Sequence, residues 1–235
     1  MKVIELLTEE ISGEISPEII KRISADCQPF LSVAGKSPIW RGVSKQDDMM
    51  RELKPSFYVG AVRNDRIASD TAERYHNAIN NYFIKYVGIP VRSASLFVSR
   101  DRSVAKEYAR GNFRKPLAIF PIGEFHYAWS PHVLDLYLAI SARGENVFTE
   151  LMDAAAIKVF GQTMEEEERI WNPDVKTGLK VFIQMLKDNP NLYNFDSGFG
   201  AAGTGEMMVV CDKYYAVAAL TSQKARTLMV ALQAK

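Results

Sequence analysis

The chain has 235 residues, of which 47% are hydrophobic and 24% are charged, the proportions of an ordinary globular protein. Its formal net charge is +1, from 29 basic and 28 acidic side chains. This balance argues against an acidic membrane as a partner; it does not indicate nucleic acid and leaves that partner open.

We expect a single domain, residues 1–235, located in the cytoplasm. No internal repeat or low-complexity linker divides the chain, and its length allows a substantial core. Two cysteines, Cys27 and Cys211, cannot form a disulfide framework, which favours a reducing compartment. The N-terminus does not read as a signal peptide, and no segment approaches the roughly 20 apolar residues that cross a bilayer.

The first half of the chain mixes short helices and short strands. Residues 1–36 are predicted to be a helical segment, with helices at Val3–Leu7 and Pro17–Ile23, the second capped by Ser16. The clearest helix follows residue 70 and places four residues on one face: Tyr75, Ile79, Tyr82 and Tyr86. Strands are expected at 37–43, 94–99 and 117–121, a short helix at 101–109, and irregular chain from 44 to about 67.

The second half is expected to carry a helical insertion, about 130–187, within a core of residues 37–235. Its three helices would begin near Ser130, Val147 and Asn172. A glycine-rich loop then leads to strands at 206–210 and 214–218, predicted to form a hairpin, and to a last helix capped by Thr221. Because strands and helices do not alternate regularly, the fold class predicted is α+β.

The glycine-rich loop contains a G-x-G-x-x-G sequence, at Gly198, Gly200 and Gly203. A dinucleotide-binding fingerprint needs a strand before these glycines and a helix directly after them. The residues that follow, Met207–Val210, have the character of a short strand. We therefore set the Rossmann interpretation aside. The glycines indicate either a flexible surface loop or a functional loop next to a catalytic residue.

Three separated segments occur in order over about 180 residues. The first is Ile39-Trp40-Arg41-Gly42, in a predicted strand. The second is the strand that ends in Phe97-Val98-Ser99, with a short helix behind it. The third is Glu206-Met207-Met208-Val209-Val210, at the start of the predicted hairpin. Together they resemble the ADP-ribosyltransferase family, in the branch described by an Arg, Ser, Glu pattern.

This resemblance implies a split, mostly antiparallel β core surrounded by helices. It also implies a glycosyltransferase that uses NAD as a substrate, needs no metal, and transfers ADP-ribose to a macromolecule, with protein the expected acceptor, or to water. Ser99 and Glu206 would be the catalytic residues. NAD would be bound by Arg41, Gly42, Trp40 and Phe97.

The expected chemistry gives each residue type a reason. Cleavage of the bond between nicotinamide and ribose builds positive charge on the sugar, and a carboxylate such as Glu206 holds the ribose hydroxyl more strongly as that charge develops. An arginine such as Arg41 binds pyrophosphate oxygens through two parallel hydrogen bonds and stays charged. A serine at a strand end, such as Ser99, can orient the ribose or the glutamate.

The chain departs from the family pattern in one informative place. Arginine-modifying members carry Glu-x-Glu, whereas this chain has Thr204-Gly205-Glu206. The difference argues against arginine as the acceptor and leaves open another acceptor, NAD hydrolysis, or a non-catalytic binding or virion-associated module on the same fold. The compact, neutral chain resembles members carried by bacteriophages, which would place it in the host cytoplasm or the virion.

Each candidate residue also has a structural explanation. Arg41 could form a strand-edge ion pair, Ser99 could be a turn serine, and Glu206 could be an exposed first residue of a strand. The aromatic rings of Trp40 and Phe97 are typical of a core. The crowded basic residues between 92 and 115 could be plain surface or could attract anionic NAD.

Other chemistries have less support in the sequence. His126 and His132 match no zinc spacing, and neither cysteine has a histidine partner at a recognisable distance along the chain. A hydrolase or nuclease that binds a divalent metal through carboxylates such as Asp135 or Glu150 is a third possibility. It rests only on the abundance of acidic residues.

Overall fold

The computed structural model describes residues 15–43, 57–64, 73–109, 116–133, 147–163, 176–203, 205–218 and 220–233. In these ranges the chain is α+β, as predicted, with two antiparallel sheets of four strands each. The helices are α2 (Pro17–Asp26), α3 (Gln28–Ala34), α4 (Glu73–Val87), α5 (Arg102–Tyr108), α7 (Val147–Phe160), α9 (Lys176–Asp188) and α10 (Ser222–Gln233). The strands are β1 (Ile39–Arg41), β2 (Phe57–Ala61), β3 (Leu96–Val98), β4 (Leu117–Ile122), β5 (His126–Trp129), β6 (Asn194–Phe195), β7 (Met207–Val210) and β8 (Lys213–Val217), and a short 3-10 helix, η2, covers Phe199–Ala201.

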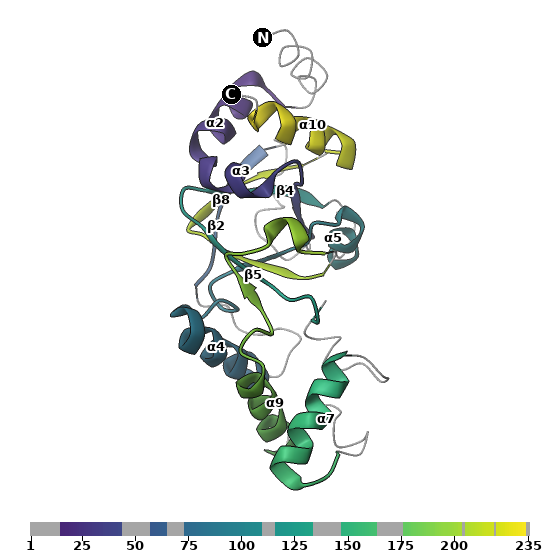
Figure 1. Ribbon diagram of the computed structural model, residues 1–235. Coiled ribbons are helices and arrows are strands. Elements are labelled where there is room, and N and C mark those ends of the chain that lie inside the picture. Colours follow the sequence, from purple (N-terminus) through teal and green to yellow (C-terminus); the bar gives the residue numbers. More distant parts are fainter. Residues whose placement is uncertain are drawn as a thin grey trace.

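The first sheet, which we call sheet A, has the strand order β1-β4-β8-β2. The helices α2, α3 and α10 pack together and lie against it at one end of the molecule (Figure 1). Its central strands are apolar on both faces, since five of the six residues of β4 are buried. Such continuous apolar strands are expected where a sheet is covered on both sides.

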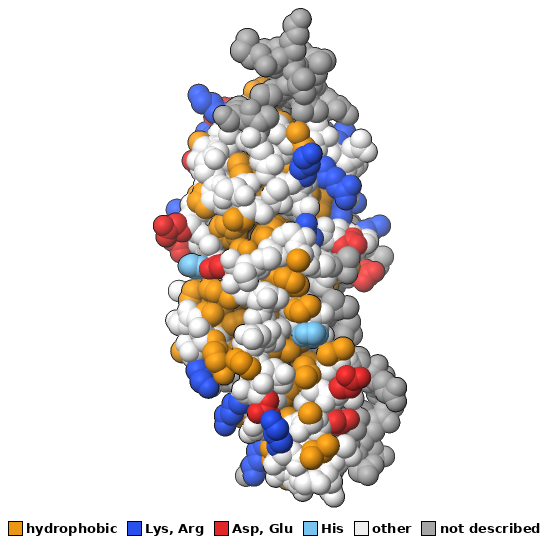
Figure 2. All heavy atoms as spheres, in the orientation of Figure 1, with side chains coloured by type: hydrophobic (Ala, Val, Ile, Leu, Met, Phe, Trp, Pro, Cys, Tyr) orange, Lys and Arg blue, Asp and Glu red, His pale blue; other side chains and the backbone are white. Residues whose placement is uncertain are grey.

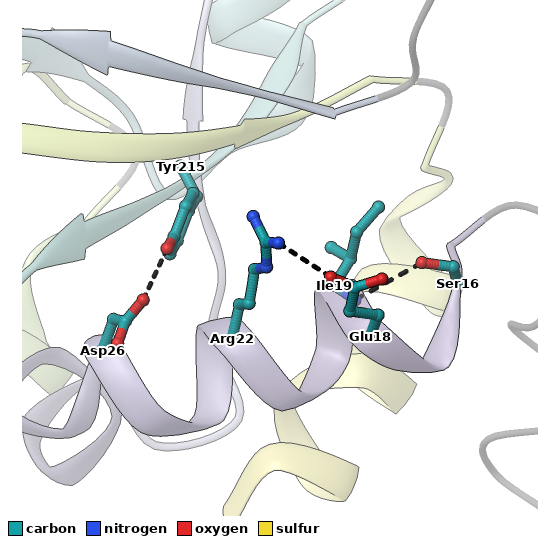
Figure 3. Close-up of polar contacts among 6 residues, drawn as sticks. All are labelled: Ser16, Glu18, Ile19, Arg22, Asp26 and Tyr215. Carbon is teal, nitrogen blue, oxygen red and sulfur yellow. Dashed lines mark hydrogen bonds and ion pairs between the residues drawn. The ribbon is translucent and has the colours of Figure 1, made fainter.

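Polar contacts lie along α2, and one of them reaches sheet A (Figure 3). The Ser16 hydroxyl accepts a hydrogen bond from the Ile19 amide at 3.4 Å and Pro17 occupies the first turn, so the predicted cap is confirmed. At the other end of the helix, the Tyr215 hydroxyl donates to the Asp26 carboxylate at 2.5 Å. This hydrogen bond ties the end of α2 to the middle of β8.

The second sheet, sheet B, has the order β3-β7-β5-β6 and separates two cores. Alternate residues of β3 and β7 point to opposite faces. Leu96, Val98, Met207 and Val209 belong to the core shared with sheet A. Phe97, Met208 and Val210 belong to the core formed with α4, α7 and α9, the three helices at the far end of the molecule (Figure 1).

Among the residues that the structure describes, one isolated backbone bridge joins the two sheets. Trp40 and Ser99 exchange both hydrogen bonds, with N···O distances of 2.7 and 2.8 Å. Gly42 allows β1 to pass close to α5, because a Cβ atom there would lie 2.8 Å from the Ala109 amide nitrogen. The arrangement therefore places β1 beside both β4 and β3.

The predicted hairpin between residues 206 and 218 is wrong. β7 pairs with β3 and β5, whereas β8 pairs with β4 and β2, so the turn at Cys211-Asp212 carries the chain from sheet B to sheet A. Both strands are central in their sheets, and each already has two hydrogen-bonded neighbours. Sequence proximity alone could not reveal this.

Three strands occur where none was predicted. β2 lies inside the segment expected to be irregular, and its Gly60 packs directly against the Tyr214 ring. β5 precedes the expected insertion and is only four residues long, and β6 has two residues. The expected helix at Val3–Leu7 and the start of the helix near Asn172 lie outside the described residues. Of the helix expected from Ser130, only residues 130–133 are described; they are not helical, and the Ser130 hydroxyl accepts hydrogen bonds from the amides of His132 and Val133.

The surface carries mixed charge. On the face shown in Figure 2, lysine and arginine side chains lie at both ends of the molecule and are interspersed with acidic ones. Hydrophobic side chains gather over its middle. Among the described helices, none combines the length and the apolar character that crossing a membrane requires.

The Tyr215–Asp26 contact yields a pH-dependent prediction. Burial, with a smaller contribution from Asp26, raises the pKa of Tyr215 from 10.0 to about 12. A raised pKa means that the folded state favours the protonated hydroxyl, so this stabilisation is complete below pH 10 and is lost as the pH rises toward 12. At pH 7 we expect Tyr215→Phe to unfold with about 1–2 kcal/mol less free energy than the wild type.

Urea unfolding of both proteins between pH 7 and 12 measures the difference. The gap between wild type and Tyr215→Phe should narrow above pH 10, because only the wild type can lose this hydroxyl proton. A gap that stays constant to pH 12 contradicts the assignment.

Candidate functional site

The three residues Arg41, Ser99 and Glu206 come from adjacent strands. In the ladder between β3 and β7, Val98 pairs with Met207, so the next pair in the same register is Ser99 with Glu206. On the other side, Ser99 bridges to Trp40, the neighbour of Arg41. Directly opposed residues have Cβ atoms about 5 Å apart, and adjacent strands are about 4.8 Å apart. The structure thus places β1 and β7, whose residues Arg41 and Glu206 are 165 positions apart in sequence, on either side of β3.

Arg41 is half-buried at the end of β1. Its guanidinium donates a hydrogen bond to the Tyr214 hydroxyl at 3.1 Å. Because Tyr215 points toward α2, the preceding Tyr214 points to the opposite face of sheet A. Arg41 therefore lies on the face of sheet A that is turned away from α2.

Ser99 is buried, and it serves the turn into α5 as well as the bridge to β1. Its hydroxyl accepts a hydrogen bond from the Asp101 amide at 3.0 Å. Asp101 then caps α5 by accepting from the Ser103 amide at 2.7 Å, and hydrogen bonds from Ser103 lower the pKa of the Asp101 carboxyl. The turn role and the position beside Glu206 are therefore compatible.

Glu206 is mostly buried and has a cationic partner. Its Oε1 lies 3.3 Å from Nη1 of Arg92, and the two side chains are 15% and 9% exposed. The Arg92 guanidinium also stacks over the Phe97 ring, 5.0 Å from its centroid. Glu206 is therefore not the exposed strand-end residue that its position in the sequence allowed.

Arg92 was not singled out from the sequence, where it was one of several crowded basic residues. Three of those residues turn inward instead of forming plain surface. Arg92 reaches Glu206, Arg100 reaches the glycine-rich loop, and Arg102 donates to the Leu220 carbonyl at 3.1 Å. Net charge and spacing could not show that they serve as internal connections.

The remaining predicted NAD-binding residues have different surroundings. Trp40 is only 1% exposed and lies in the core shared by sheets A and B. What it contributes to the site is the backbone bridge to Ser99. Phe97 is half-buried beneath Arg92, and Gly42 lies against α5. NAD binding by these three residues stays a prediction.

The glycine-rich loop is anchored at several points. Phe199 packs edge-on against Phe30 and Tyr127, with centroids 5.9 and 5.0 Å away. The Arg100 guanidinium donates to the carbonyls of Phe199, Gly200 and Ala202 at 3.0, 2.5 and 2.8 Å. A strand follows the loop, so the Rossmann interpretation was correctly set aside.

The histidines and cysteines offer no competing centre in the part of the chain that the structure describes. His126 pairs with Asp196, at 2.6 Å between Nδ1 and Oδ2, and not with His132. No cluster of three or more potential metal ligands occurs in these ranges, and Asp135 lies outside them. Burial raises the pKa of both thiols, that of Cys211 to about 12, which keeps them as unreactive thiols near neutral pH.

Replacing Arg100 with methionine should loosen the glycine-rich loop. The substitution removes a guanidinium that hydrogen-bonds three loop carbonyls and the Ser37 hydroxyl. Hydrogen exchange at the Ala201 and Ala202 amides should accelerate by about tenfold or more, the equivalent of about 1.4 kcal/mol.

The control is Arg22→Met, which removes only an exposed ion pair with Glu18 on α2. It should leave exchange in the loop unchanged. Unaltered exchange in Arg100→Met would show that the aromatic anchor alone holds the loop.

Comparison of the chain with known protein families, curated proteins and solved structures found no match in any of the three. What this site does must therefore be argued from its own residues.

Proposed function

We propose that the protein is an NAD-dependent ADP-ribosyltransferase whose catalytic carboxylate is Glu206. The observation that carries the proposal is the meeting of Arg41, Ser99 and Glu206 on three neighbouring strands. A phosphate-binding cation, a hydroxyl and a carboxylate are the groups that cleavage of NAD requires. Their location on neighbouring strands supports the proposal that the three short segments belong to one site.

The architecture is compatible with this proposal. Two antiparallel sheets meet at the bridge between β1 and β3, and helices pack on both ends of the pair. We propose that they correspond to the split β core of ADP-ribosyltransferases. In that arrangement NAD would extend from Arg41, past the end of β3, to Glu206.

The proposed reaction breaks the bond between the ribose C1′ and the nicotinamide nitrogen. The bonding electron pair leaves with nicotinamide, and positive charge develops on the ribose. Glu206 accepts a hydrogen bond from a ribose hydroxyl, which becomes stronger as that charge grows. A nucleophilic atom of the acceptor then bonds to C1′ and releases its proton to solvent.

Two residues would support this step. Arg41 would bind the pyrophosphate through its guanidinium. Ser99, which lies opposite Glu206, is itself fixed in place. Its backbone bridges to Trp40, and its hydroxyl accepts a hydrogen bond from the Asp101 amide in the turn that follows. Rigid placement of this kind is how supporting groups contribute to catalysis.

The acceptor would be a macromolecule, with protein the first expectation, or water. Thr204 stands where arginine-modifying enzymes have a second glutamate, so another acceptor group is proposed. The anchored loop immediately before Glu206 lies in a suitable place to contact it. A bacteriophage product acting in the host cytoplasm or from the virion fits this proposal.

A non-catalytic binding or virion-associated module is the second candidate. The pairing of Glu206 with Arg92 favours it, because a buried ion pair can be purely structural. The two candidates differ in one respect that is simple to measure: only the enzyme releases nicotinamide in a way that depends on Glu206.

The test is nicotinamide release from NAD by the wild type, Glu206→Gln and the control Glu124→Gln, with and without a cell lysate. Glu124 is an exposed residue of the turn between β4 and β5, so its variant should match the wild type. Glu206→Gln should be slower by about a hundredfold or more, as for the loss of a charge-stabilising group. Lysate proteins should gain the mass of ADP-ribose only with active protein.

Two results would favour the binding module. One is a folded wild type that releases no nicotinamide and shows no thermal shift at millimolar NAD. The other is release that Glu206→Gln leaves unchanged.

A further inference from the structure

The mostly buried arginine beside Glu206 is held by the structure around it. Arg92 lies in the turn between α4 and β3, in which the amides of Ser93 and Ala94 both donate to the Pro90 carbonyl at 3.0 Å. Asn80 of α4 forms two hydrogen bonds with the same turn. Its Nδ2 donates to the Ser93 hydroxyl at 2.6 Å, and its Oδ1 accepts from the Ser93 amide at 3.2 Å. The backbone that carries Arg92 is thus tied to the longest described helix.

The Arg92 side chain is confined as tightly as its backbone. Its guanidinium lies between the Phe97 ring and the Glu206 carboxylate, and Arg92 as a whole is 8% exposed. Burying a guanidinium is costly unless it is paired, and leaving either member of a buried pair alone is costlier still. Because separating the pair would leave a buried charge without its partner, the Glu206 carboxylate stays beside Arg92, on the side of sheet B that faces α4.

The contact between Arg92 and Glu206 is longer than a typical charge-assisted hydrogen bond. Charge-assisted N–H···O bonds are usually about 2.7–2.9 Å long, and a carboxylate offers about four lone-pair positions. At 3.3 Å, the contact with Nη1 of Arg92 is longer than that range. In the proposed reaction, a ribose hydroxyl would donate to this carboxylate while Arg92 remains in place.

We propose that Arg92 is the positioning residue of Glu206, an inference that rests on the proposed function. It acts by orienting the carboxylate, since its own positive charge would not stabilise a cationic ribose. Arg41 remains the residue that binds the pyrophosphate. Loss of Arg92 should therefore affect the rate of the chemical step and leave the binding of NAD nearly unchanged.

The experiment compares wild type, Arg92→Met, Arg92→Lys and the control Arg22→Met. For each protein, kcat and KM for nicotinamide release, the Kd for NAD and the melting temperature are measured. Arg92→Met should lower kcat by about tenfold or more with Kd within about twofold, the pattern of a lost orienting contact. Arg92→Lys, which keeps a cation at this position, should recover part of the rate, and Arg22→Met should equal the wild type.

A double-mutant cycle with Glu206→Gln asks whether Arg92 acts through Glu206. In that background Arg92→Met should cause no further loss of rate, because the carboxylate it orients is already gone. Should Arg92→Met fail to fold, Asn80→Ala replaces it. This variant weakens the support of the turn and should lower kcat by a smaller factor at unchanged Kd.

Several outcomes overturn the inference while the proposed function stands. A higher kcat in Arg92→Met would make Arg92 an inhibitory latch. A weaker Kd at unchanged kcat would make it a phosphate ligand, and a lysine variant no better than methionine would make its role purely structural. A wild type without nicotinamide release would remove the inference and the proposed function together.

Discussion

The pair of hydrogen bonds between Trp40 and Ser99 is the constraint on which the site depends. Within the described residues, sheets A and B otherwise have separate strand partners, and this bridge brings the strand of Arg41 beside the strand of Ser99. Gly42 is part of the same constraint, since a side chain there would push β1 away from α5. With β1 displaced, Trp40 would no longer reach Ser99, and the strand of Arg41 would lose its place beside β3.

Buried arginines provide the second level of organisation. Arg92 connects the turn after α4 to Glu206, and Arg100 connects the end of β3 to the loop that leads into Glu206. Burial lowers the pKa of the Arg100 guanidinium, a sign that its charge is costly in this place, and its hydrogen bonds offset that cost. Arg92 thus contacts the proposed catalytic residue itself, and Arg100 contacts the loop that precedes it.

Local signals in the sequence predicted local structure well. Ser16, Asp101 and Thr221 each receive a backbone hydrogen bond at the start of the helix that they were expected to cap. The helix stripe after residue 70 is buried at Tyr75, Ile79 and Tyr82, although Tyr86 is 39% exposed. Capping and periodicity depend on neighbours within a few positions, so one sequence contains the information they need.

Strand pairing and the partners of the site depend on distant residues, and there the sequence was insufficient. The turn at Cys211-Asp212 was interpreted as a hairpin because adjacent strands usually pair, yet here both strands are central in different sheets. The order of Arg41, Ser99 and Glu206 predicted the candidate residues, but not the ion pair with Arg92. That pair joins positions 114 residues apart, and no periodic pattern relates them.

The most direct test of the central claim is a crystal structure with an NAD analogue whose bond between ribose and nicotinamide resists cleavage. One NAD-binding site spanning β1, β3 and β7 predicts the pyrophosphate within hydrogen-bonding distance of the Arg41 guanidinium. It also predicts a ribose hydroxyl on the Glu206 carboxylate, with Arg92 still beside it. An analogue bound elsewhere, or no binding at millimolar concentration, would contradict the claim that these three strands form an NAD site.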